Sequence, residues 1–134
     1  MSTVTAVANK TKFLRVVLTL DAVVTGGNGL IYLIAAPLVS DLLGPDTGLL
    51  RGIGVFLVLY GLAVGALAAR REISVGGTKT FIAMNSAWTI GSVAAVIFGL
   101  LAFTTIGAIW AVMQAAVVGA FAALQVTGLR KAAS

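Results

Sequence analysis

The sequence predicts an all-α membrane protein, a polytopic up-down-up-down bundle of four transmembrane helices. Its 134 residues are 60% hydrophobic and only 10% charged, whereas soluble domains are about a quarter charged. The mean hydropathy of the chain is +1.10. Four apolar segments also reach the ~20 residues that a helix needs to cross ~30 Å of hydrocarbon. These observations place residues 1–134 in a single transmembrane domain.

Turn-forming and charged residues mark where each predicted helix begins and ends. The first helix ends at Pro37, and the stretch SDLLGPDTG that follows is rich in aspartate, glycine and proline. The second helix ends before Arg70, and a short link near Thr104 separates the third from the fourth. Because such short connections force neighbouring helices to be antiparallel, the bundle alternates up and down. The predicted helices cover roughly residues 13–38, 49–69, 80–102 and 105–128.

Basic residues before the first apolar segment raise the alternative of a cleaved signal peptide. The segment is longer than the apolar core of a signal peptide, and it contains Asp21 and Asn28. Pro37 also stands where cleavage would need small, flexible residues. We therefore expect this segment to remain in the protein as its first transmembrane helix.

The basic residues lie almost entirely on one side of the predicted bundle. Of the nine Lys and Arg residues, only Arg51 falls beside the first and third loops. Because positive residues accumulate in cytoplasmic loops, we expect both termini to be cytoplasmic, in a plasma membrane. Tyr32 and Trp110 then lie towards the outer interface, where amphipathic aromatic side chains are common. The other basic residues are Lys10, Lys12, Arg15, Arg70, Arg71, Lys79, Arg130 and Lys131.

A stripe of polar side chains runs along the first predicted helix. Its members are spaced i, i+4, i+7 and i+11, which places them on one helical face. A charge near the bilayer centre costs ~3 kcal/mol on insertion scales, so we expect this face to point into the bundle. The nearest cations, Arg15 and Lys79, would have to extend from the interface to reach the carboxylate. The stripe consists of Asp21, Thr25, Asn28 and Tyr32.

The alternating topology places polar residues of other helices at matching depths. Asn85 in the third helix lies level with Asp21, and Gln114 in the fourth lies level with Asn28. Hydrogen bonds between transmembrane helices contribute ~0.6–2 kcal/mol each, so such pairs specify which helix faces which. Because intramembrane carboxylates commonly mark proton, ion or ligand pathways, these residues also form a candidate ligand site. Its predicted members are Asp21, Thr25, Asn28, Asn85 and Gln114.

Small residues recur at four-residue spacing in the second and fourth predicted helices. Such ridges lack bulky side chains, so helix backbones approach closely along them. They serve either packing within one bundle or contact between subunits, and the sequence leaves both alternatives open. Three glycines between residues 26 and 29 similarly favour close approach or a kink in the first helix. The predicted packing or oligomer face comprises Gly61, Gly65, Gly107, Ala111, Ala115 and Gly119.

The absence of histidine and cysteine from the sequence narrows the function. It removes the commonest general base, cysteine nucleophiles, and thiolate or imidazole metal ligands. We therefore expect no enzymatic activity, no cofactor and no metal site. The basic residues flank apolar segments and do not form a patch with interleaved aromatics, so we expect no binding of nucleic acid.

Two hypotheses for the function remain. The first is association within the membrane, as an accessory or assembly subunit of a larger complex or as a homo-oligomer, with membrane lipids and other transmembrane subunits as partners. The alternative is a small oligomeric transporter or channel in which Asp21 is a proton- or cation-coupled site. Small multidrug transporters similarly have four helices and an acidic residue in the first, but the basic residues here predict a single orientation.

Three stretches of the sequence resemble a group of known proteins. These stretches are LTLDAVVTGGNGLIYL, LLRGIGVFLVLYG and MNSAWTIGS. They are similar to those of small, uncharacterised actinobacterial four-helix integral membrane proteins, over most of residues 14–130. The resemblance implies the four-helix architecture and carries no activity with it.

Overall fold

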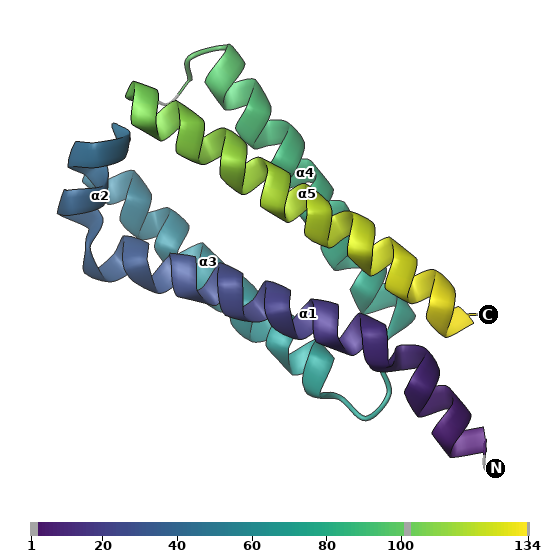
Figure 1. Ribbon diagram of the computed structural model, residues 1–134. Coiled ribbons are helices and arrows are strands. Elements are labelled where there is room, and N and C mark those ends of the chain that lie inside the picture. Colours follow the sequence, from purple (N-terminus) through teal and green to yellow (C-terminus); the bar gives the residue numbers. More distant parts are fainter. Residues whose placement is uncertain (1–2, 101–102, 134) are drawn as a thin grey trace.

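The computed structural model describes residues 3–100 and 103–133. All regular structure in these ranges is helical, and four of the helices are long and apolar enough to cross a membrane. The N- and C-termini lie at the same end of the bundle (Figure 1), as the alternating topology requires. The predicted all-α bundle is therefore confirmed. Its helices are α1 (Thr3–Ile34), α2 (Ala36–Leu43), α3 (Thr47–Ala69), α4 (Val75–Ile97) and α5 (Thr105–Ala133).

The short helix α2 is an element that the sequence analysis did not predict. The first predicted helix, residues 13–38, starts earlier and ends at Ile34, and the chain then bends into α2. Pro37 lies in the first turn of α2, where its missing N–H leaves no hydrogen bond unmade. The stretch expected to form a turn is thus helical as far as Leu43, and the chain reverses at Gly44, whose φ is 106°.

The third predicted helix, residues 80–102, both begins and ends earlier than expected. Ser74 caps its first turn, because the Ser74 hydroxyl accepts a hydrogen bond from the Gly77 N–H at 3.0 Å. The helix stops before Gly99, whose φ of 64° lies in the left-handed region that ends many helices. Residues 101–102 of the prediction lie outside the described residues.

The other two predicted helices extend further than expected. The second, residues 49–69, begins at Thr47 because the Asp46 carboxylate accepts a hydrogen bond from the Gly48 N–H at 2.9 Å. The fourth, residues 105–128, continues to Ala133. Capping side chains thus decide where α3 and α4 begin, and the hydropathy of a segment alone does not reveal them.

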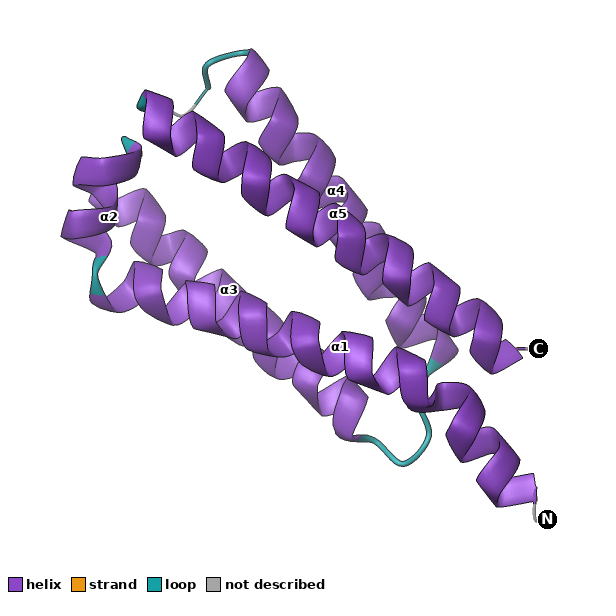
Figure 2. Cartoon of the chain, in the orientation of Figure 1, coloured by secondary structure: helices purple, strands orange, loops and turns teal. Residues whose placement is uncertain are grey.

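The helices are arranged as two closely packed pairs, α1 with α3 and α4 with α5. Figure 2 shows the two pairs side by side, with α2 at the end of the bundle opposite the termini. Helices α1 and α5 join the pairs through many contacts, whereas α3 and α4 touch at few positions. The bundle is therefore tight on three of its sides and loose on the side between α3 and α4.

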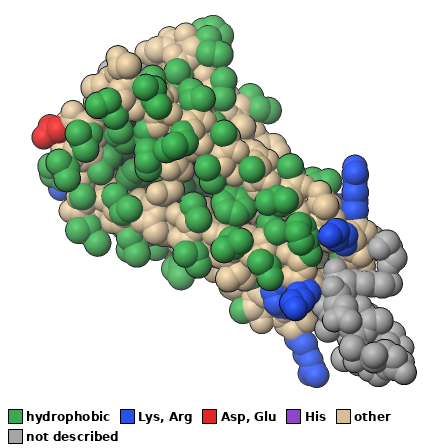
Figure 3. Space-filling model, in the orientation of Figure 1, with side chains coloured by type: hydrophobic (Ala, Val, Ile, Leu, Met, Phe, Trp, Pro, Cys, Tyr) green, Lys and Arg blue, Asp and Glu red, His purple; other side chains and the backbone are tan. Residues whose placement is uncertain are grey.

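The surface of the bundle is divided into an apolar body and a basic end. Figure 3 shows hydrophobic side chains over most of the visible face and Lys and Arg side chains at the end that carries the termini. Large apolar side chains such as Ile34 and Ile90 are 81% and 70% exposed. Exposure of this kind is expected where lipid, and not water, surrounds the protein.

Candidate functional site

Asp21 lies in the interior of the bundle, with 1% of its surface exposed. The hydroxyl of Thr25, one turn along α1, donates a hydrogen bond to its Oδ1 at 2.8 Å. The side-chain amides of Asn85 on α4 and Gln125 on α5 donate to its Oδ2 at 3.0 and 2.7 Å. The expectation that Asp21 faces inward is therefore confirmed, and both of its carboxylate oxygens are hydrogen-bonded.

Asn85 connects this carboxylate to the remaining membrane-spanning helix. Its side-chain oxygen accepts a hydrogen bond from the Tyr60 hydroxyl of α3 at 2.7 Å, and its amide group also donates to the Gln125 side-chain oxygen at 3.1 Å. One buried cluster thus contains a side chain from each of the four membrane-spanning helices. We call it the inner polar network; it consists of Asp21, Thr25, Tyr60, Asn85 and Gln125.

The donors around Asp21 are neutral. Arg15, which we expected to be able to reach it, instead donates hydrogen bonds to backbone carbonyls at the end of α3, among them those of Ala68 and Arg70. Lys79 lines a groove between α4 and α5, away from the carboxylate. Within the described ranges, Asp21 therefore has hydrogen-bond donors and no ion pair. The Arg15 guanidinium instead stabilises backbone carbonyls at the C-terminal end of α3.

A second set of polar contacts joins α1 to α5 nearer the end of the bundle that contains α2. The Asn28 amide donates to the Gln114 side-chain oxygen at 3.1 Å, as the predicted depths implied. One turn further along, the Trp110 indole N–H donates to the Tyr32 hydroxyl at 2.8 Å. We call these the outer polar pairs. Each contains one hydrogen bond between two helices, whereas the inner polar network joins four.

The predicted candidate residues therefore separate into two groups. Asp21 and Asn85 belong to the inner polar network together with Thr25, while Asn28 and Gln114 form one of the outer polar pairs. Two members of the inner polar network, Tyr60 and Gln125, were not among the residues predicted from the sequence. Gln125 lies 11 residues after Gln114, about three helical turns, so helical spacing alone was a usable signal for it.

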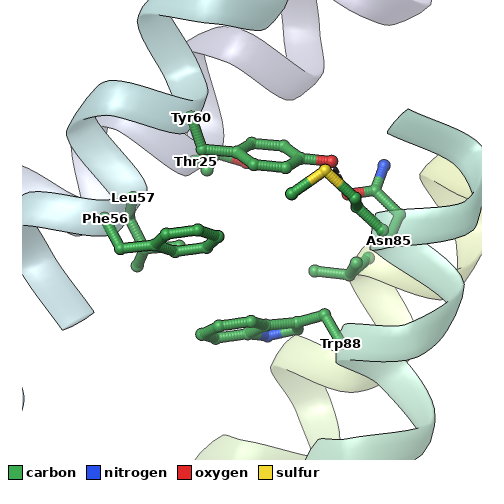
Figure 4. A pocket seen from close by; sticks show the side chains of 8 residues that line it. Thr25, Phe56, Leu57, Tyr60, Asn85 and Trp88 are labelled. Atoms are coloured by element: carbon green, nitrogen blue, oxygen red, sulfur yellow. Dashed lines mark hydrogen bonds between the residues drawn. The ribbon is translucent and has the colours of Figure 1, made fainter. Parts of the chain in front are cut away.

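The loose side of the bundle contains a groove, which we call the α3–α4 groove. It lies where the rings of Phe56 on α3 and Trp88 on α4 stack with their centroids 6.0 Å apart and their planes at 8° (Figure 4). Towards the end of the bundle that contains α2, the groove adjoins a pocket of about 530 Å³, which shares Met84 and Trp88 with it and is also lined by residues of α1, α2 and α5. At its inner end it is bordered by Thr25, Tyr60 and Asn85, so it reaches the inner polar network.

The small residues predicted to form a packing or oligomer face are used within the chain. A Cβ atom at Gly61 would lie 2.9 Å from the Gly26 backbone on α1, and Gly107 lies directly against the backbone of Leu43 on α2. Gly119 leaves room for Thr89 of α4, whose side chain a Cβ would approach to 3.4 Å. Of the others, Gly65 faces Ala22, Ala115 is buried, and Ala111 lines the α3–α4 groove.

The geometry of these groups limits the chemistry that they support. The inner polar network holds one carboxylate, one phenol, one aliphatic hydroxyl and two neutral amides. Among these groups the carboxylate is the one whose chemistry suits a proton or a cation. Comparison of the sequence with protein-family models, with curated proteins and with solved structures finds no match. The resemblance to small actinobacterial membrane proteins therefore stays a prediction, and the function has to be argued from the geometry.

Proposed function

We propose that this protein works by association within the membrane, as an accessory or assembly subunit of a larger complex or as a homo-oligomer. Its place would be the plasma membrane, with both termini in the cytoplasm, because the basic residues gather at the end that carries the termini. The proposal includes no enzymatic activity. In support, Glu72 lies at the end of the bundle opposite Asp41 and Asp46, so it is unable to form a catalytic carboxylate pair with either of them.

The observation that carries the proposal is the incomplete packing between α3 and α4. These helices follow one another in the chain and run antiparallel, yet they leave the α3–α4 groove between them. Most of the small residues predicted to form an oligomer face pack inside the chain. The α3–α4 groove is therefore the part of the bundle best suited to receive a transmembrane segment of another subunit, because close packing is what drives helix association in lipid.

Trp88 also supports the proposal that the α3–α4 groove contacts another subunit. It borders the groove along its length, and its indole N–H donates no hydrogen bond within the described residues. Trp88 lies near the middle of α4, at a depth where lipid chains offer no acceptor. A neighbouring helix with a hydroxyl, amide or exposed carbonyl oxygen would satisfy this donor, and interhelical bonds of this type contribute ~0.6–2 kcal/mol.

Cysteine cross-linking in native membranes tests the proposal, because the natural chain has no cysteine. Ala87→Cys places a thiol in the α3–α4 groove, and Ala116→Cys places one at a similar depth on the exposed face of α5. We expect a reagent with one thiol-reactive end and one photoreactive end to link Ala87→Cys to a partner or to a second copy, and to leave Ala116→Cys as a monomer. A monomeric mass for both variants, together with a monomeric native mass in mild detergent, would overturn the proposal.

The inner polar network favours a second candidate function, proton- or cation-coupled transport. Asp21 is buried and has no counter-ion among the residues that the structure describes, and the α3–α4 groove comes within one hydrogen bond of it through Thr25 and Asn85. Because a four-helix chain encloses little space, the pathway would need the groove to be completed by another subunit. The test is flux of protons, sodium and potassium in liposomes that contain the natural chain or Asp21→Asn. Transport that Asp21→Asn abolishes supports this function, and equal flux for the two proteins excludes it.

A further inference from the structure

A second groove lies at the basic end of the bundle, between α4 and α5. Its volume is about 520 Å³, within the range of ligand-binding sites. Its walls are apolar, formed among others by Ile82 and Ala83 of α4 and Val126 and Leu129 of α5. We call it the α4–α5 groove. It is separate from the α3–α4 groove and shares no lining residue with it.

Two cations border this apolar groove. Lys79 of α4 and Arg130 of α5 both line it, and both are exposed. Neither forms an ion pair or a hydrogen bond with the part of the chain that the structure describes. The N-terminus of α4 lies at the same place, since Val75, its first residue, also lines the groove. The positive end of the helix dipole therefore adds to the two side-chain charges.

We infer that the α4–α5 groove binds an anionic glycerophospholipid from the leaflet at the basic end of the bundle. The phosphate would lie between Lys79 and Arg130, and an acyl chain would follow the apolar wall towards Ala83. This combination of a basic rim with an apolar groove between transmembrane helices matches the way that membrane proteins hold anionic lipid headgroups. The inference does not depend on the proposed function, because it uses neither the α3–α4 groove nor Asp21.

The charge distribution favours an anionic lipid over a zwitterionic one. Glu72 is the only acidic residue among those described at this end, and it does not line the groove. A phosphate that carries an uncompensated negative charge would therefore meet two cations and no nearby carboxylate. A headgroup with its own ammonium group would bring that positive charge close to Lys79 and Arg130, which weakens binding.

The test compares lipid binding by the natural chain with binding by variants of the groove and by a matched control variant. The purified, delipidated protein is titrated with phosphatidylglycerol or phosphatidylcholine in detergent, and bound lipid is counted by native mass spectrometry. The double variant Lys79→Gln/Arg130→Gln removes both cations of the groove. The matched control Arg70→Gln/Arg71→Gln removes the same charge from exposed residues at the same end that do not line the groove.

We expect the natural chain and the control to prefer phosphatidylglycerol and the groove variant to bind it about tenfold more weakly. Ala83→Phe, which fills the apolar wall and keeps both cations, should also weaken binding. Inorganic phosphate at millimolar concentration should not displace the lipid, because it lacks the acyl chain; displacement would assign the site to free phosphate and overturn the inference. An equal loss in the groove variant and the control, or no preference for the anionic lipid, would overturn it as well. Unchanged helical circular dichroism checks that each variant is folded.

Discussion

Helix α3 packs in opposite ways against its two neighbours, α1 and α4. The face of α3 towards α1 carries glycine where it meets the α1 backbone. A Cβ atom at Gly54 would lie 2.8 Å from the Gly29 carbonyl oxygen. Towards α4, helix α3 carries the aromatic rings of Phe56 and Tyr60, which hold the two backbones apart. Helix α3 therefore packs tightly against α1 and leaves a groove beside α4.

This difference shows how side-chain size determines which helices of a small membrane bundle pack tightly and which leave a groove between them. Dispersion between closely approaching backbones stabilises the α1–α3 pair, because lipid provides no hydrophobic force to bring helices together. Across the α3–α4 side, stability instead depends on a few ring contacts and on the hydrogen bond from Tyr60 to Asn85. We therefore expect substitutions in the α1–α3 interface to lower the free energy of unfolding more than substitutions between α3 and α4.

The largest effect is expected at the glycine contact between α1 and α3. In Gly29→Ala, the new Cβ would lie 2.8 Å from both the Gly54 carbonyl oxygen and the Val58 backbone nitrogen. Backbone atoms have little freedom to move, so the free energy of unfolding should fall by about 3 kcal/mol. Gly27→Ala is the matched control, because nothing lies within 4 Å of its new Cβ. Unfolding in mixed micelles measures both, and equal stabilities would contradict the close approach of α1 and α3.

The next effect is expected at Asn85, which joins α4 to the other three membrane-spanning helices. Asn85→Leu removes the hydrogen bonds to Asp21, Tyr60 and Gln125, and it should lower the free energy of unfolding by about 2 kcal/mol. Asn28→Leu loses a single bond, to Gln114, and should cost about 0.6 kcal/mol. The same unfolding measurement ranks the two variants. A greater loss for Asn28→Leu would mean that the outer polar pairs, and not the inner polar network, hold the helices together.

A smaller effect is expected for the hydrogen bond that crosses from α3 to α4. Tyr60→Phe removes the hydroxyl that donates to Asn85 but keeps the ring, which packs edge-on against Phe81 at 5.2 Å. The free energy of unfolding should fall by about 1 kcal/mol. In a double-mutant cycle with Asn85→Leu, the second substitution should then cost less than it does alone. Fully additive losses would show that the two side chains do not interact.

The smallest effect on folding is expected at Trp88. Trp88→Leu removes the stacking on Phe56, which contributes about 0.5–1 kcal/mol, while Leu keeps most of the apolar area. The same substitution should clearly reduce the cross-linking of Ala87→Cys, because it changes the wall of the α3–α4 groove. Val23→Leu on the exposed face of α1 is a control that should change neither measurement. A large loss of stability with unchanged cross-linking would place Trp88 in the folding core instead of at an interface.

Much of the polar interior was predictable, because helical spacing and depth are properties of the sequence. The i, i+4 step from Asp21 to Thr25 and the matching depths of Asp21 with Asn85 and of Asn28 with Gln114 all correspond to hydrogen bonds. Each requires only the 3.6-residue period and an alternating topology.

Other features were not predictable, because they depend on rotation about helix axes and on capping. Tyr60 resembles any aromatic residue of an apolar segment until the rotation of α3 points its hydroxyl at Asn85. The helix α2 appears in the sequence as turn-forming residues, yet contacts of Leu43 with α3 and α5 make it helical. Packing energy from distant segments decided both outcomes, and local sequence patterns do not contain it.

Hydropathy and charge act on each segment independently, so the order of residues alone is enough to specify four apolar helices with a basic end. It also determined that Asp21 had to be shielded, since hydrocarbon does not solvate a carboxylate. Which helices pack tightly against one another, and which leave a groove, is instead settled by the packing of the folded bundle. That choice depends on whether glycine or an aromatic ring meets the facing helix, and it is made only when two helices are in contact.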